Sequence, residues 1–256
     1  MAPHRHPLLI AHRGESRDAP ENTLAAIRLA WSRGAAAVEL DVRLTGDGAV
    51  VVVHDPDLRR TGGASLVVAR ATAAELRALD VGRWKDPSWA GERVPLLGEV
   101  LATVPSHGRL FIEIKSGPET AAALEREVRA CGLQSHQILL MSFDPATVGA
   151  AARALPDCEA CLLRTARDWT RARGIDAAIE EARARGCTAL DVEYDRRLDR
   201  DVVDAVHAAG MRLYVWTINR PAVAARLLAA GIDGVTTDRC AWMAAQVGNR
   251  GDERES

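Results

Sequence analysis

Short apolar runs alternate along the chain with longer stretches in which apolar residues recur about every 3.6 positions. NTLAAIRLAWSRG and DRDVVDAVHAAG are two stretches with this helical period. The apolar runs have the length of buried strands. Eight of them are found, at residues 8–11, 37–42, 110–114, 138–141, 160–163, 189–192, 213–216 and 234–237. The pattern therefore predicts a chain of alternating strands and helices.

Glycines mark where several of the predicted helices end, and a strand-like run follows each of them. A glycine after the last turn is a common helix C-cap; the residues are Gly34, Gly132, Gly186, Gly210 and Gly231. Repeated strand–helix units imply parallel strands with right-handed crossovers. Eight units in 256 residues favour a closed (β/α)₈ barrel of the TIM type. An open doubly wound sheet is the alternative, but no G-x-G-x-x-G follows the first strand.

One long segment interrupts this rhythm. Residues 55–96 exceed a simple loop and contain RRTGGAS and RWKDPSWAGERVP, so we expect an insertion after the second barrel strand. Such an insertion is either a substrate wall or a decorated surface loop, and Trp84 and Trp89 favour a packed one. We expect residues 1–247 to form a single domain, and the polar residues 248–256 to form a flexible tail.

The composition is that of a folded globular protein, with 48% apolar residues and 27% charged residues. The net charge is −2, and both signs are spread along the chain. This balance argues against nucleic acid as a partner, so an anionic substrate must be bound by a local site. The oligomeric state is left open.

The five cysteines form no framework, which predicts reduced thiols and a cytoplasmic location. Cys158 and Cys161 form an isolated C-x-x-C that is only half of a typical zinc site, so we interpret the pair as structural. The N-terminal residues contain no apolar stretch long enough for a signal peptide or a membrane span.

Three carboxylates lie near the ends of neighbouring predicted strands: Glu39 and Asp41 in VELDV, and Glu113 in FIEIK. Residues two apart on a strand face the same side, and active sites of these barrels lie at the carboxyl ends of the strands. Buried carboxylates need a cation, and oxygen ligands suit Mg²⁺ or Ca²⁺. The carboxylate cluster (Glu39, Asp41 and Glu113) therefore predicts a divalent metal site. An ion-pair network with Lys115 and no metal is the alternative.

Two histidines and two cations accompany this cluster. His12 ends the first strand in AHRG, and His54 ends a short return segment in VVVHD. Two histidines can serve as acid and base in one displacement. Arg13 and Lys115 suit a phosphate group, since Arg offers bidentate contacts and Lys a point charge. A salt bridge to a neighbouring carboxylate is the alternative for each. No role is assigned to His4, His6, His107, His136 or His207.

Several motifs together resemble the glycerophosphodiester phosphodiesterases. The matching pieces, in order, are HRG at 12–14, PENT at 20–23, ExDV at 39–42, DG at 47–48, HD at 54–55, FIEIK, the SF of LLMSFDP, YVWTIN and GVTTDR. They span residues 8–239. HRG alone is a weak signal, but the ordered set is specific. The sequence departs from the family pattern at Ala36, in RRTGGAS and at Cys240.

The resemblance implies a metal-dependent TIM-type barrel that hydrolyses glycerophosphodiesters to an alcohol and sn-glycerol 3-phosphate. It implies that the carboxylate cluster holds the metal and that the two histidines act as general acid and base. It places Arg13 and Lys115 at phosphate-contacting positions and Trp216 at a substrate-side aromatic position. Neither the order of the two histidines nor the nucleophile, water or a substrate hydroxyl, is assigned.

Three other functions compete with this interpretation. A catalytically silent barrel would bind phosphorylated ligands, but all the proposed catalytic groups are present. Relatives of the family cleave lysophospholipids or other lipids, for which the sequence offers no exposed apolar or basic amphipathic helix. An isomerase or aldolase with a Schiff-base lysine would need an apolar pocket, whereas Lys115 lies among carboxylates.

Overall fold

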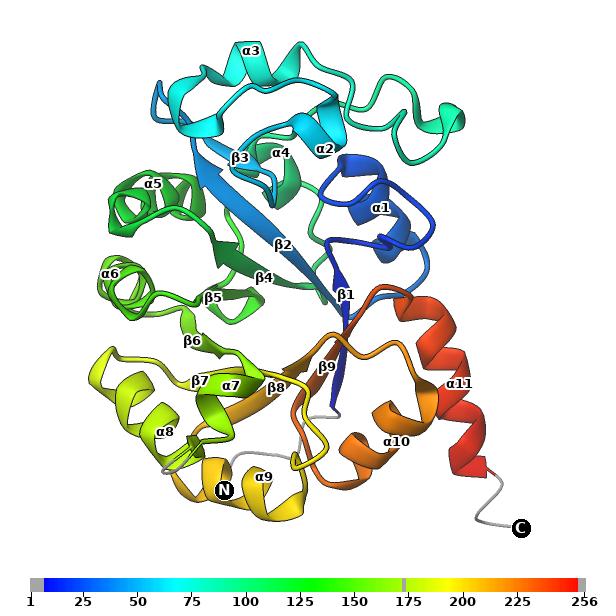
Figure 1. Cartoon of the computed structure of the whole chain (residues 1–256), viewed down its shortest axis with the longest axis vertical. Helices are drawn as coiled ribbons and strands as arrows, with labels where there is room; N and C mark the ends of the chain where they lie inside the picture. Colours follow the sequence, from blue (N-terminus) through cyan, green and yellow to red (C-terminus); the bar gives the residue numbers. More distant parts are fainter. Residues whose placement is uncertain (1–6, 172–173, 253–256) are drawn as a thin grey trace.

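Eight parallel strands close into a barrel in the computed structural model, which describes residues 7–171 and 174–252 (Figure 1). The neighbours around the barrel are β1, β9, β8, β7, β6, β5, β4 and β2, and pairing of β1 with β2 closes it. The bounds are β1 Leu8–His12, β2 Ala37–Leu44, β4 Arg109–Ile114, β5 Ile138–Ser142, β6 Glu159–Arg164, β7 Ala189–Glu193, β8 Arg212–Trp216 and β9 Gly234–Thr237. All eight predicted strands are present, and the barrel is confirmed over the open sheet.

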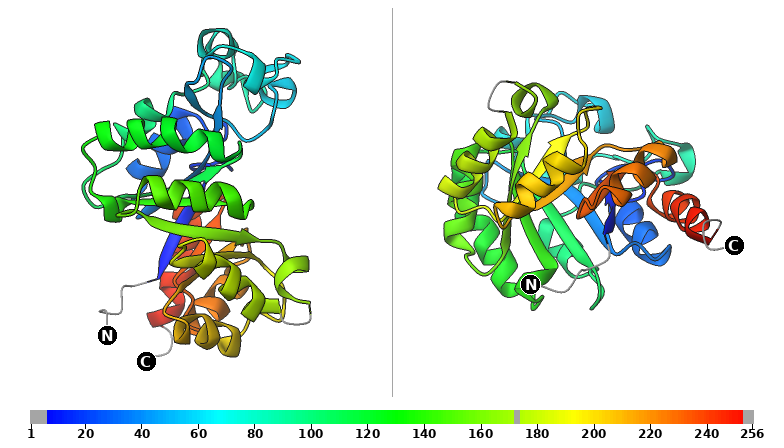
Figure 2. Two further views of the ribbon diagram at one scale, coloured as in Figure 1. Left: turned by 90° about the vertical axis from the view of Figure 1, so that its left-hand side faces the viewer. Right: turned by 90° about the horizontal axis from the view of Figure 1, so that it is seen from below.

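Helices cover the outside of the barrel (Figures 1 and 2). They are α1 Leu24–Ser32, α4 Leu97–Leu101, α5 Ala121–Ala130, α6 Pro145–Ala154, α7 Ala166–Trp169, α8 Gly174–Ala184, α9 Arg200–Ala208, α10 Pro221–Ala229 and α11 Cys240–Asp252, with 3₁₀ turns η3 Pro118–Thr120 and η4 Ser135–Gln137. The five glycines predicted to end helices all have positive φ, as a left-handed C-cap requires.

The strands alternate between two faces. On β7, Leu190 and Val192 pack against the helices, while Ala189 belongs to the apolar cluster inside the barrel. This alternation, one residue in and one out, is the pleat of a β-strand. Asp191 therefore shares the inner face with Ala189, and the same rule places the side chains of the other strand ends.

The insertion is a packed unit at one end of the molecule (Figures 1 and 2). It follows β3 (Val50–Val52), which pairs antiparallel with β2, and contains α2 Arg59–Gly62, η1 Val68–Arg70, α3 Ala73–Arg77 and η2 Pro87–Trp89. Its core includes Leu58, Leu76 and Val94. Trp84 lies outside that core with 40% of its surface exposed, so the tryptophan is not what packs this segment.

The C-terminal helix α11 extends to Asp252 and so includes residues 248–252 of the predicted tail. The remaining tail residues, 253–256, and His4 and His6 lie outside the described residues. No helix in the described parts of the chain is long and apolar enough to cross a membrane. The cytoplasmic location stays a prediction.

Candidate active site

A pocket of about 260 Å³ opens at the carboxyl ends of the strands, where barrel enzymes place their chemistry. One side is polar and the other apolar. Its lining residues are His12, Arg13, Glu39, His54, Glu113, Lys115, Met141, Phe143, Leu163, Asp191, Trp216, Thr217 and Thr236. Seven of the eight predicted site residues are among them, and the eighth, Asp41, lies buried beneath Arg13 and Lys115.

The carboxylate cluster occupies adjacent strands, because Asp41 of β2 pairs with Glu113 of β4. One oxygen from each of the three residues lies within 4.8 Å of the others, and all three are buried. The spacing of Glu39 and Asp41, two residues apart, puts both side chains on the inner face of β2. The structure thus brings together the three carboxylates predicted from the sequence.

The loop after β1 holds the cluster through backbone and amide contacts. Arg13 adopts φ 56°, and its backbone N–H donates to Oε2 of Glu39 at 2.9 Å. Gly14 follows at φ 84°, and a Cβ there would lie 2.6 Å from the carbonyl carbon of Ala26. The glycine of the HRG motif is therefore required by both the turn and the packing against α1.

Asn22 of the PENT motif holds Asp41 from the side. Its Nδ2 donates to Oδ2 of Asp41 at 2.8 Å, and the backbone N–H of Asp41 donates back to Oδ1 of Asn22 at 3.1 Å. Thr23 then caps α1 by accepting the backbone N–H of Ala26. The PENT motif thus connects the start of α1 to Asp41 of the carboxylate cluster.

Burial and mutual repulsion dominate the protonation of the cluster. Burial, together with the charges of Asp41 and Glu113, raises the pKa of Glu39 well above its usual value. Burial and Asp41 raise the pKa of Glu113 to about 7. Burial opposes ionisation of Asp41 too, but Arg13 and Lys115 outweigh it and lower the pKa of that carboxyl.

The cations present do not neutralise the cluster. Lys115 Nζ lies 2.7 Å from Oε1 of Glu113 and 3.2 Å from Oδ1 of Asp41, and Arg13 Nε lies 3.1 Å from Oδ2 of Asp41. Arg13 also binds Glu21, so its charge is shared. Three carboxylates thus face fewer than two full positive charges, and the buried Oδ1 of Asp41 has the ion pair with Lys115 but no hydrogen bond. This oxygen-rich, under-neutralised set fits a divalent cation.

His12 is held by a carboxylate from the far end of the chain. Its Nδ1 lies 2.6 Å from Oδ1 of Asp238, and its Nε2 lies 4.0 Å from Oε2 of Glu39. Asn219 fixes Asp238 from both sides: its Nδ2 donates to Oδ2, and its Oδ1 accepts the backbone N–H of Asp238. A histidine oriented through Nδ1 presents Nε2 to a substrate.

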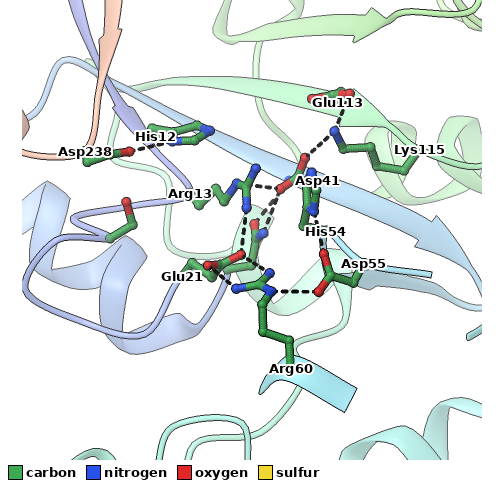
Figure 3. Close-up of polar contacts among 12 residues, drawn as sticks. His12, Arg13, Glu21, Asp41, His54, Asp55, Arg60, Glu113, Lys115 and Asp238 are labelled. Carbon is green, nitrogen blue, oxygen red and sulfur yellow. Dashed lines mark hydrogen bonds and ion pairs between the residues drawn. The ribbon is translucent and has the colours of Figure 1, made fainter. Parts of the chain in front are cut away.

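His54 is held by its sequence neighbour, with Nδ1 at 2.7 Å from Oδ1 of Asp55 (Figure 3). Arg60 of α2 donates from Nε to Asp55 at 2.7 Å and from both terminal nitrogens to Glu21. Glu21 in turn binds Arg13 Nη1 at 2.7 Å. A continuous chain of ion pairs therefore links the insertion to both His54 and Arg13 (Figure 3).

The pKa values of His54 and of its carboxylate partner Asp55 are both lowered. Burial lowers the pKa of His54, with Arg13 and Lys115 adding to the effect of burial and Asp41 opposing it. The hydrogen bond from Arg60 lowers the pKa of Asp55 to about 2. Near neutral pH, Asp55 is thus an anion that can orient a neutral imidazole.

Sequence reasoning assigned no role to four residues that hold this site: Glu21, Asp55, Arg60 and Asp238. Asp55 adjoins His54, so adjacency was the available signal. Glu21 lies in a matched motif without a stated partner. Arg60 lies in RRTGGAS, and nothing in the sequence connects Asp238 with His12. Of the other strand-end carboxylates, Glu193 accepts the backbone N–H of Ala166, a structural contact.

Comparison with known proteins identifies a family that the chain matches. The model of the glycerophosphoryl diester phosphodiesterase family matches residues 12–241. A glycerophosphodiester phosphodiesterase of Caldanaerobacter subterraneus subsp. tengcongensis is 32% identical over 90% of this chain and 93% of its own. One from Bacillus subtilis is 31% identical over 90% and 83%. A solved phosphodiesterase of Oleispira antarctica, in complex with the product sn-glycerol-3-phosphate, is 30% identical with a TM-score of 0.85, covering 94% of this chain and 97% of that one.

Proposed function

Because the chain belongs to the glycerophosphoryl diester phosphodiesterase family and is a phosphoric diester hydrolase, we propose that it converts glycerophosphodiesters to an alcohol and sn-glycerol 3-phosphate with a divalent metal and two acid–base histidines. The observation that carries this proposal is the position of His12 and His54, which line one pocket beside the carboxylate cluster and are each held at Nδ1 by an aspartate.

Glu39, Asp41 and Glu113 would hold the metal, and their oxygen ligands favour Mg²⁺ or Ca²⁺. Such an ion supplies Lewis-acid stabilisation of a phosphate oxygen. The excess negative charge of the cluster and the raised pKa values of Glu39 and Glu113 support this assignment, since both indicate carboxylates that lack a sufficient cation.

Arg13 and Lys115 place two positive charges beside the cluster, and both line the pocket. A phosphodiester gains negative charge in the transition state, and fixed cations stabilise that charge. Trp216 lines the opposite wall and packs edge-on against Phe143, with ring centroids 5.5 Å apart. We assign the two cations to the phosphate and Trp216 to the carbon skeleton of the substrate.

The histidines move the protons of the reaction. One imidazole accepts the proton of the attacking hydroxyl or water, and the other donates a proton to the alkoxide that leaves phosphorus. With water as the nucleophile, the net change adds one water across the P–O bond and leaves the two histidines with exchanged protonation states, which proton exchange with solvent resets. With a substrate hydroxyl as the nucleophile, a cyclic phosphodiester forms first, and its opening by water with the two histidine roles reversed completes the hydrolysis and restores the pair. General acid–base catalysis of this kind contributes about 10²–10⁴-fold in rate. The barrel and its insertion at 55–96 form one catalytic domain in this scheme.

A panel of substrates tests the proposal. Purified protein is incubated with glycerophosphocholine, glycerophosphoethanolamine and a lysophospholipid, each with Mg²⁺, Ca²⁺ or Mn²⁺. Release of glycerol 3-phosphate from the soluble diesters, lost on chelation and restored by metal, is expected. Lysophosphatidic acid as the main product would instead assign a lysophospholipase D activity. Binding of substrate without any product would assign a silent binding barrel.

Two variants test the histidines separately from the metal. His12→Ala and His54→Ala are each expected to lower kcat by at least about 10²-fold, while calorimetry shows metal binding within a few-fold of the parent. Near-full turnover by either variant would contradict the two-histidine scheme. His136→Ala is the control, because His136 lines a separate pocket around Arg109 and Glu159 and not the catalytic one.

A further inference from the structure

Asp191 is a buried carboxylate inside the catalytic pocket to which the hydrolytic scheme assigns no task. It lies near the carboxyl end of β7, on the inner face, and only 2% of its surface is exposed. Three strands separate β7 from β2 in either direction around the barrel, so Asp191 lies across the pocket from Glu39 and Asp41. A substrate whose phosphate lies at the cluster extends one arm towards it.

Two polar atoms on this side of the pocket are buried and have no hydrogen-bond partner: Oδ1 of Asp191 and Nε1 of Trp216. Asp191 pairs in register with Tyr214 on β8, two residues before Trp216, so the two side chains lie on the same face of neighbouring strands. A buried polar atom without a partner is costly and uncommon. One atom is an acceptor and the other a donor.

Nothing in the described part of the chain neutralises Asp191. Burial, with the charge of Glu113 added, raises the pKa of Asp191 well above its usual value, and no cation is paired with it. Apolar side chains of Met141, Leu163 and Phe143 line the neighbouring wall together with the Trp216 ring, and Thr217 and Thr236 complete the lining. The carboxyl group and the indole N–H thus lie beside an apolar surface.

We infer that Asp191 and Nε1 of Trp216 form a subsite for a hydroxyl group of the substrate, on the arm that crosses the pocket from the phosphate. This inference rests on the proposed function and specifies what that site recognises. A hydroxyl accepts from the indole N–H and bonds to the carboxyl group at the same time, whether the latter is ionised or protonated. An ammonium group can only donate, and an ester carbonyl can only accept.

The surroundings fit a short polyol. The apolar wall contacts carbon atoms, and the two polar atoms select a hydroxyl on that carbon chain. This chemistry is met by a hydroxyl of the glycerol arm or by one on the alcohol at the other side of phosphorus. A site built to bond a hydroxyl discriminates strongly against an analogue without it, because its polar groups are then left unpaired.

The test uses three diesters: glycerophosphopropanol, with hydroxyls on glycerol alone; glycerophospho-ethylene glycol, with hydroxyls on both arms; and p-nitrophenyl propyl phosphate, with none. Asp191→Val is expected to lower kcat/KM by about 30-fold or more for hydroxyl-bearing diesters and by less than about threefold for the third. Asp191→Asn, which keeps a hydrogen-bonding side chain, is expected to lose less than about tenfold. Equal losses on all three diesters, or no loss, would overturn the inference.

The two hydroxyl sources give different results. If Asp191→Val lowers kcat/KM for both glycerol diesters, the subsite binds glycerol. If it lowers kcat/KM only for the ethylene glycol diester, the subsite binds the other alcohol. Leu163→Val is the matched control, because Leu163 pairs with Asp191 in register on β6 and lines the same pocket without a polar group. This control variant is expected to change kcat/KM for all three diesters by the same small factor.

Binding separates this inference from the hydrolytic function. Calorimetry compares glycerol 3-phosphate with propyl phosphate, which lacks the hydroxyls. The parent is expected to prefer glycerol 3-phosphate, and Asp191→Val to reduce that preference about tenfold. An unchanged preference in both Asp191 variants would contradict a glycerol subsite even in a protein that cleaves no diester, whereas absent turnover alone contradicts only the proposed function.

Discussion

Nδ1 of His12 lies 2.6 Å from Oδ1 of Asp238, although 226 positions separate the two residues in the chain. The contact follows from closure of the barrel, since β1 pairs with β9 and Ala11 lies in register with Thr237. His12 follows Ala11 and Asp238 follows Thr237, so both side chains lie at the same edge of the barrel. His12 and Asp238 therefore meet only when the first and last strands are joined.

Replacing Asp238 tests whether this contact orients His12. We expect Asp238→Asn to lower kcat by about 10²-fold or more, because a neutral amide no longer holds the imidazole in one tautomer or stabilises its protonated form. Asp233→Asn is the control, since Asp233 forms a 2.8 Å ion pair with His207 and this pair lies away from the pocket. Steady-state kinetics and thermal unfolding decide: equal losses in the two variants would contradict the role.

Arg60 connects the insertion with the catalytic groups. We expect Arg60→Gln to lower kcat about tenfold and to shift the acid limb of the pH profile upward. Arg60 keeps the pKa of Asp55 at about 2, and without it Asp55 takes up a proton at a higher pH and releases His54. Arg59→Gln is the matched control, because the exposed Arg59 contacts Asp57 and Ser65 instead.

Metal binding is expected to release protons and to weaken as the pH falls. The pKa of Glu113 is about 7 in the metal-free protein, and that of Glu39 is raised as well. Below pH 7 these carboxyls hold protons that a cation must displace, so affinity for Mg²⁺ or Ca²⁺ is greater at pH 8 than at pH 6. Calorimetry in two buffers of different ionisation enthalpy measures the release, and a pH-independent affinity would refute it.

The turn in HRG predicts a sharp difference between two glycines. Gly14→Ala is expected to destabilise the folded protein by about 2 kcal/mol or more and so to lower its thermal midpoint. The reason is that the new Cβ would overlap the backbone of Ala26, at 2.6 Å. Gly48→Ala is the control: Gly48 has φ 80° but no neighbour within 4 Å, so only the backbone cost of about 1 kcal/mol applies. Equal shifts in the two thermal midpoints would contradict the packing argument.

Local patterns were sufficient to predict most of the architecture. Each barrel strand is a short apolar run, and the glycines at the ends of helices follow from the backbone conformation that a C-cap needs. Glu39 and Asp41 could be placed on one face from their spacing, because the strand period is two. Parallel strands in a barrel present their carboxyl ends at one face, so the position of His12, Lys115 and Trp216 at that face was also predictable.

Only the tertiary structure decided which side chains hold these groups. Asp238 reaches His12 through strand closure, Arg60 reaches Glu21 through the fold of the insertion, and the isolation of Asp191 follows from neighbours on three other strands. Sequence periodicity specifies which face of an element a residue occupies. It does not specify distances between elements, because these depend on packing among residues far apart in the chain, and hydrogen bonds and pKa shifts depend on those distances.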